Sequence, residues 1–178
     1  EIEFEIADGN AKGEKIKVFT TRPDTIFGVT FLTIAPEHSL LEKLSNDLTN
    51  EEINKYKKES LKKSEIERQE NKEKTGIFTG SHAINPVNGK RIPIWVSDYV
   101  LGGYGEGAVM AVPAHDDRDY EFAKKFNLDI VEVIEKPAGV IDDNPCYHGE
   151  GVMINSGEFN GQDSANVREQ ITDWLEQS

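Results

Sequence analysis

The segment from Gly105 to Asp119, GEGAVMAVPAHDDRD, decides most of what the sequence predicts. It runs from a glycine-rich turn through an apolar run, Ala108 to Val112, into one histidine and three aspartates. We expect the apolar run to form a buried strand that carries these polar residues at its end. Carboxylates placed there are costly unless a cation faces them. The segment therefore predicts a polar site at the end of a core strand.

A second segment, FTTRPDTIFGVTF from Phe19 to Phe31, has the same character. Here a β-type run is interrupted by TTRPDT, residues 20–25, and strand character is expected to resume over Ile26 to Ile34. Two polar clusters set into apolar strands of one small domain are candidates for the two walls of one site.

The flanking sequence predicts an α+β fold with a compact, barrel-like core of short strands flanked by helices. Ile2 to Ile6 alternates apolar and acidic residues, as a half-exposed strand does, and Asn88-Gly89 is a strong hairpin signal. Further short β-type runs follow at close spacing, and Asp116 to Phe126 has the pattern of a helix. Many short strands with few helices favour a closed or nearly closed sheet.

Length and composition bound the class of protein. At 178 residues the chain is expected to form one domain, residues 1–178, and because it lacks an initial methionine we interpret it as a fragment of a longer protein. No apolar run approaches the roughly 20 residues of a membrane span. Cys146 is the only cysteine, so an internal disulfide is excluded and a reducing, cytoplasmic location is expected.

The net charge is -13, from 33 acidic and 20 basic residues. A protein that holds a nucleic-acid backbone by itself needs the opposite sign, because phosphate neutralisation supplies most non-specific affinity. Either nucleic acid is not the partner, or another part of a larger protein delivers it and only a small portion enters this domain.

Several simpler interpretations compete with a site. Acidic residues are ordinary at a helix start, and threonine is a good strand former. Ligand types for a metal occur in His115 with Asp116 and Asp119, and in Cys146 with His148, but these spacings match no strong zinc pattern, so no metal site is predicted. No G-x-S-x-G elbow is present, and the glycine-rich loop precedes a strand rather than a helix, which is the wrong order for phosphate binding.

The two segments together resemble the editing domain inserted into bacterial leucyl-tRNA synthetase. TTRPDT at Thr20 to Thr25 is similar to the threonine-rich motif of that family, and YGEGAVMAVPAHDDRDYEFA at Tyr104 to Ala123 is similar to its second motif. The resemblance covers essentially the whole chain, and Glu106 departs from it by standing where threonine is common. Related editing domains of isoleucyl and valyl type are the alternative, together with a catalytically degenerate insertion.

The resemblance implies roles for the polar residues. Asp119 would bind the charged α-amino group of the amino acid, and Asp116 would be a further acidic residue of the site. Thr20 and Thr21 would supply hydroxyls for the ester and the terminal ribose. His115 would serve either as a base or as a structural histidine, and Arg22 would either contact a phosphate or brace Asp24.

The resemblance also implies how substrates are selected. Thr25 would collide with the branched side chain of leucine, Met110 and Val112 would form an apolar wall, and Tyr104 would hold the terminal nucleotide. The reaction would be hydrolysis of the aminoacyl ester of mischarged tRNA(Leu), carrying isoleucine, norvaline or a similar residue. No cofactor is expected, since ATP would serve only the missing aminoacylation domain. The expected partners are the tRNA 3′ end and the rest of the synthetase, with a monomeric chain and no membrane.

Overall fold

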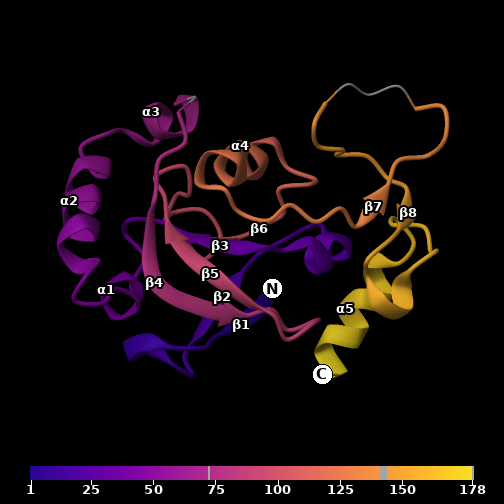
Figure 1. The fold of residues 1–178 in the computed structure, drawn as a ribbon, viewed down its shortest axis with the longest axis horizontal. Helices are drawn as coiled ribbons and strands as arrows, with labels where there is room; N and C mark the ends of the chain where they lie inside the picture. The colour runs from indigo at the N-terminus through magenta and orange to yellow at the C-terminus, as the bar shows by residue number, and fades with distance from the viewer. Residues whose placement is uncertain (72, 141–143, 178) are drawn as a thin grey trace. The chain divides into compact units, whose positions relative to one another are not determined.

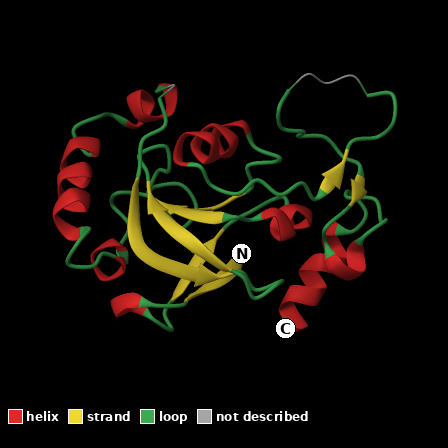
Figure 2. Ribbon diagram, viewed as in Figure 1, coloured by secondary structure: helices red, strands yellow, loops and turns green. Residues whose placement is uncertain are grey.

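A six-stranded sheet is the largest feature of the computed structural model, which describes residues 1–71, 73–140 and 144–177. Over these residues the strand order is β2-β1-β4-β5-β3-β6. The strands are β1 (Ile2–Ile6), β2 (Lys15–Val18), β3 (Phe31–Ile34), β4 (Ile77–Ile84), β5 (Arg91–Val96) and β6 (Ala108–Ala111). Figure 2 shows the sheet as a curved layer of short strands. The predicted α+β fold with a barrel-like core is thereby confirmed.

The described residues cluster into two units. The first comprises Glu1–Thr20 and Phe31–Met110, and the second comprises Thr21–Thr30 and the residues from Ala111 onward. The expected single domain over residues 1–178 stays a prediction. No helix in the described ranges is both long and apolar enough to cross a membrane.

The first unit contains most of the sheet. β1 pairs antiparallel with β2 and β4, β4 pairs antiparallel with β5, and β5 pairs parallel with β3. As the alternation in Ile2–Ile6 predicts, Phe4 and Ile6 are fully buried while the glutamates between the apolar residues are exposed. The unit also contains η1 (Gly9–Ala11), α1 (Leu41–Leu44), α2 (Asn50–Ser60) and α3 (Glu65–Glu70). α1 and α2 pack against β4 (Figure 1).

The second unit is built around short elements. They are η2 (Pro23–Gly28), α4 (Asp117–Phe126), β7 (Ile134–Glu135), β8 (Val152–Met153), η3 (Gly157–Phe159) and α5 (Arg168–Gln177). Phe27 of η2 packs on Phe159, with ring centroids 5.9 Å apart, and Phe159 meets Trp174 of α5 edge to face at 6.1 Å. These aromatic contacts fasten η2 to the carboxyl-terminal part of the chain.

The expected strand over Ile26 to Ile34 is wrong in its first half, because residues 23–28 form a 3₁₀ helix and β3 starts at Phe31. Pro23 stands at the start of η2, where its fixed φ suits a helical turn. At the other end, a Cβ on Gly28 would lie 3.0 Å from both the Val131 carbonyl oxygen and Val133 Cγ2. The local geometry of Pro23 and the tertiary contact at Gly28 both favour the helical turn over the strand preference of these residues.

Candidate functional site

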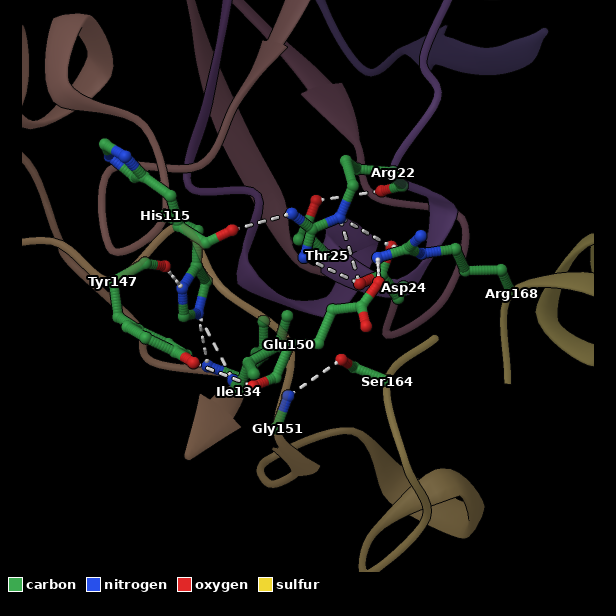
Figure 3. A network of polar contacts seen from close by, with 12 residues as sticks. Arg22, Asp24, Thr25, His115, Ile134, Tyr147, Glu150, Gly151, Ser164 and Arg168 are labelled. Atoms are coloured by element: carbon green, nitrogen blue, oxygen red, sulfur yellow. Dashed lines mark hydrogen bonds and ion pairs between the residues drawn. The ribbon is translucent and has the colours of Figure 1, made fainter. Parts of the chain in front are cut away.

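Asp24 is the centre of the polar network in the second unit. Its carboxylate is fully buried and lies between two arginines. Arg22 Nη2 donates to Asp24 Oδ2 at 2.8 Å, with Nε at 3.1 and 3.2 Å from the two oxygens, and Arg168 Nε donates to Oδ1 at 3.1 Å. Figure 3 shows the guanidinium groups on either side of the acid. A buried carboxylate needs such partners, since an uncompensated one is strongly destabilising.

Arg22 connects this centre to the 146–148 segment, because its Nη1 donates to the carbonyl oxygen of His148 at 3.2 Å. Of the two roles left open for Arg22, the contacts support bracing of Asp24. Arg168 also reaches Glu150, with 3.3 Å between Nη2 and Oε1. The network thus joins η2, α5 and the segment before β8.

Thr25 follows directly in η2 and is 4% exposed. Its Oγ1 donates to the carbonyl oxygen of Arg22 at 2.9 Å. Because threonine is β-branched and this bond fixes χ1, the position of the methyl group is fixed as well. Thr25 therefore presents a rigid rather than an adaptable surface.

The end of β6 and the start of α4 position the aspartates. Asp116 is the N-cap of α4, and its Oδ1 accepts from the backbone amides of Arg118 at 2.9 Å and Asp119 at 3.1 Å. Asp119, in the first turn, is 6% exposed, and its Oδ2 accepts from the Val112 amide at 2.9 Å. The helix cap and the strand end thus hold Asp119 from both sides. The predicted helix from Asp116 is confirmed, with α4 itself beginning at Asp117.

His115 has both ring nitrogens in hydrogen bonds. Nδ1 lies 2.6 Å from the carbonyl oxygen of Tyr147, to which only an N–H can bond, so Nδ1 carries the proton. Nε2 then accepts from the backbone amides of Val133 at 3.1 Å and Ile134 at 3.2 Å. Burial lowers the pKa of His115 from 6.5, which keeps the ring neutral. With no lone pair left for a substrate proton, the geometry favours the structural role of His115 over that of a base.

The other predicted residues fall in both units. Thr21 is exposed and Val112 is buried. Seven of the predicted residues lie in the second unit: Thr21, Arg22, Thr25, Val112, His115, Asp116 and Asp119. Thr20, Met110 and Tyr104 belong to the first unit, where Met110 is buried and Tyr104 is 74% exposed. The membership of these three residues in the site stays a prediction.

Sequence reasoning missed Arg168 and the backbone carbonyls of Tyr147 and His148. A buried acid in TTRPDT requires a cation, but nothing in the sequence selects Arg168, 144 positions away, from the 20 basic residues. Main-chain acceptors carry no residue-type signal at all. The support of the site therefore emerges only from the folded chain.

Comparison with known proteins gives a consistent result. The family model described as "Leucyl-tRNA synthetase, editing domain" matches residues 1–176. Curated leucine–tRNA ligases of Rubrobacter xylanophilus and Clostridium tetani are each 51% identical over 98% and 99% of this chain. One from a Synechococcus species is 55% identical over 84% of the chain. The chain spans about a fifth of the length of these relatives, 21% in the first two cases and 18% in the third.

Among solved structures, a ternary complex of Agrobacterium radiobacter K84 LeuRS with tRNA and LeuAMS is similar in fold, with a TM-score of 0.70 and 31% identity. The match covers 99% of this chain and 18% of that one. The resemblance found in the two sequence motifs is confirmed, and the leucyl branch is supported over the isoleucyl and valyl alternatives.

Replacing the two arginines tests the Asp24 network. Either Arg22→Ala or Arg168→Ala leaves one guanidinium beside the acid, and each is expected to lower the free energy of unfolding by about 1–3 kcal/mol. The double variant leaves the buried carboxylate without either arginine. Its loss of unfolding free energy should therefore exceed the summed losses of the two single variants by about 0.5–3 kcal/mol. Urea denaturation measures all three. Arg118→Ala, at an exposed pair, is the control and changes stability by less than about 1 kcal/mol. If the loss of unfolding free energy in the double variant equals the sum of the two single losses, the two arginines do not share a role at Asp24.

The state of His115 gives a pH dependence. Its folded pKa is lowered from 6.5, so below about pH 6.5 the unfolded chain takes up a proton that the folded chain refuses, and stability falls. His115→Gln removes this loss. The gap in unfolding free energy between wild type and variant should therefore narrow from pH 7.5 to pH 5, measured by denaturation at each pH. His38, whose pKa burial also lowers, is common to both proteins and cancels. A gap that is constant or widens would show that His115 is not held neutral.

Proposed function

The chain belongs to the leucyl-tRNA synthetase editing domain family, and we propose that it hydrolyses the ester between a wrong amino acid and the 3′ end of tRNA(Leu). Isoleucine and norvaline are the proposed side chains. The observation that supports this most is the pair of rigidly held residues in one unit, Asp119 in the first turn of α4 and Thr25 in η2. They supply the two things that proofreading needs, an anion for the amino group and a surface that rejects leucine.

Asp119 is proposed to bind the α-ammonium group of the esterified amino acid. Asp119 is 6% exposed as a residue, so its carboxylate is shielded from water and attracts a cation more strongly than a surface acid would. The Val112 amide and the Asp116 cap fix its direction before a ligand arrives. Asp116 therefore acts as a positioning residue for Asp119.

Thr25 is proposed to exclude leucine by steric collision. A single methylene changes binding by only about 1–3 kcal/mol through attraction, so discrimination needs a clash with the cognate side chain. The hydrogen bond from Thr25 Oγ1 to the Arg22 carbonyl, together with the Asp24 network beneath it, prevents the methyl group from moving aside. Val112 and Met110 are the proposed apolar wall around the accepted side chain.

The nucleophile is proposed to be a water molecule positioned by substrate and protein. Its oxygen bonds to the ester carbonyl carbon, and the bond from that carbon to the ribose oxygen breaks. One water proton passes to the ribose oxygen, the other passes to solvent, and the amino acid leaves as a carboxylate. An aminoacyl ester is already reactive, so orientation and charge stabilisation supply the acceleration. His115 holds the 146–148 segment through Tyr147 instead of removing the proton. Thr20 and Thr21 are the proposed hydroxyl donors to the ester and the ribose, and Tyr104 the proposed contact to the terminal nucleotide.

The proposed partners explain the acidic composition. The remainder of a synthetase chain would bind most of the tRNA, and only the aminoacylated 3′ end would enter this domain. A net charge of -13 is then tolerable because the tethered body supplies the phosphate contacts. We place the protein in the cytoplasm as a monomer, with no cofactor for hydrolysis.

Thr25→Ala is expected to permit hydrolysis of correctly charged leucyl-tRNA(Leu), because the clash is gone. Release of labelled leucine measures the rate, in the chain and in a synthetase that carries it, and should rise by at least tenfold. Thr25→Val is the matched control, because it replaces the hydroxyl with a methyl group and keeps a β-branched side chain whose χ1 is restricted by its own shape, so it should still spare leucine. If Thr25→Ala spares leucyl-tRNA as the wild type does, the steric assignment fails.

Asp119→Ala is expected to lower the rate of isoleucyl-tRNA(Leu) deacylation by at least a hundredfold, since the ammonium group loses its partner. Asp119→Asn tests the charge with the shape retained and should lose nearly as much. Glu121→Gln, an exposed change on the same helix, should hydrolyse at the wild-type rate. Wild-type rates in both Asp119 variants would remove the assigned role and would fit a catalytically degenerate insertion.

A further inference from the structure

The second unit contains a cluster of three potential metal ligands in addition to the residues assigned above: Asp117, Cys146 and His148. Sequence spacing pairs Cys146 with His148, but only the fold brings in Asp117, the first residue of α4. Cys146 Sγ lies 2.7 Å from Asp117 Oδ1 and 3.4 Å from His148 Nε2. His148 Nε2 lies 3.3 Å from the same carboxylate oxygen. Three different donor atoms thus form one small triangle.

This geometry does not fit a catalytic cysteine with a histidine base. In such a triad the two imidazole nitrogens divide the work, one facing the nucleophile and the other facing the acid. Here the same atom, His148 Nε2, faces both the thiol and the carboxylate. The three ligand atoms converge on one point, as ligands around an ion do, and do not form a chain of hydrogen bonds from acid to histidine to thiol.

The separations suit a tetrahedral ion of the size of zinc. With bond lengths of about 2.0–2.3 Å to oxygen, nitrogen and sulfur, ligand atoms stand about 3.3–3.6 Å apart. Two sides of the triangle, 3.3 and 3.4 Å, are in this range or at its edge. The third, 2.7 Å, is a thiol hydrogen bond that must lengthen, and Asp117, with 55% of its side chain exposed, has room to turn.

We propose that Asp117, Cys146 and His148 bind one Zn²⁺ ion, with solvent at the fourth position. A thiolate and an imidazole select a borderline-soft ion over Mg²⁺ or Ca²⁺, which prefer oxygen ligands. On binding, the sulfur–zinc bond replaces the sulfur–hydrogen bond, and the proton passes to solvent. The partly exposed His148 and Asp117 give the ion a path to the buried sulfur.

Such an ion would stiffen the support of the candidate active site. The 146–148 segment gives the Tyr147 carbonyl to His115 and the His148 carbonyl to Arg22. Zinc would fasten this segment to the first turn of α4, two residues before Asp119. The three zinc ligands take no part in the proposed hydrolysis, so zinc binding can be tested independently of the editing activity.

Titration of the purified chain with Co²⁺, a spectroscopic substitute for Zn²⁺, tests the proposal. The wild type should bind one equivalent, with a thiolate-to-cobalt charge-transfer band and the intense visible bands of four-coordinate cobalt, and Zn²⁺ should displace it. Cys146→Ser should lose the charge-transfer band, and Asp117→Asn and His148→Gln should each weaken binding at least tenfold. Glu121→Gln is the matched control on α4 and should bind as the wild type does.

Thermal unfolding provides a second measurement that does not depend on cobalt. A Zn²⁺ concentration that saturates the wild type should raise its midpoint by about 5 °C or more relative to chelator, and should leave Cys146→Ser unchanged. Absence of the charge-transfer band in the wild type at excess Co²⁺ would overturn the proposal. So would a band, or a zinc-dependent midpoint, that persists in Cys146→Ser.

Discussion

The buried carboxylate of Asp24 is the constraint on which the candidate site depends. A charge that is fully buried must be paired, and here Arg22 and Arg168 pair it from opposite ends of the chain. This requirement fixes the start of η2, because Arg22, Asp24 and Thr25 share one short turn. The aromatic contacts of Phe27 add apolar packing to the same element. The proposed specificity at Thr25 would therefore depend on ion pairs that do not involve the substrate.

The second wall of the site is held by the backbone rather than by other side chains. Main-chain amides bond to Asp119 and Asp116, and the Tyr147 carbonyl orients His115. A site with so many fixed contacts loses little entropy when a ligand binds, and it needs no rearrangement at the moment of reaction. This suits the proposed hydrolysis of an ester that is already activated, where positioning matters more than proton removal.

Much of the fold was predictable from the sequence, because apolar alternation in Ile2–Ile6 and the cap signal at Asp116 are local patterns. The two polar segments were also recognisable, since TTRPDT and the residues after β6 interrupt apolar runs. What local patterns could not supply were contacts over long separations, such as Arg168 with Asp24 or Asp117 with Cys146. The 3₁₀ turn of η2 escaped prediction for the same reason, because the close approach of Val131 and Val133 to Gly28 is a tertiary contact that local patterns do not show. His115 is neutral and has hydrogen bonds at both ring nitrogens. This state likewise depends on main-chain carbonyl and amide groups, which the residue types do not reveal.

The central claim is that the site is organised before the aminoacyl group arrives. Crystal structures of the chain alone and with a non-hydrolysable aminoacyl-adenosine analogue test it most directly. A site organised in advance should hold the ammonium nitrogen within about 3 Å of an Asp119 oxygen and the amino-acid side chain against the Thr25 methyl group. The Arg22–Asp24–Arg168 contacts should be the same in both structures. An ammonium group bound away from Asp119, or an Asp24 released from its arginines when the ligand binds, would contradict it.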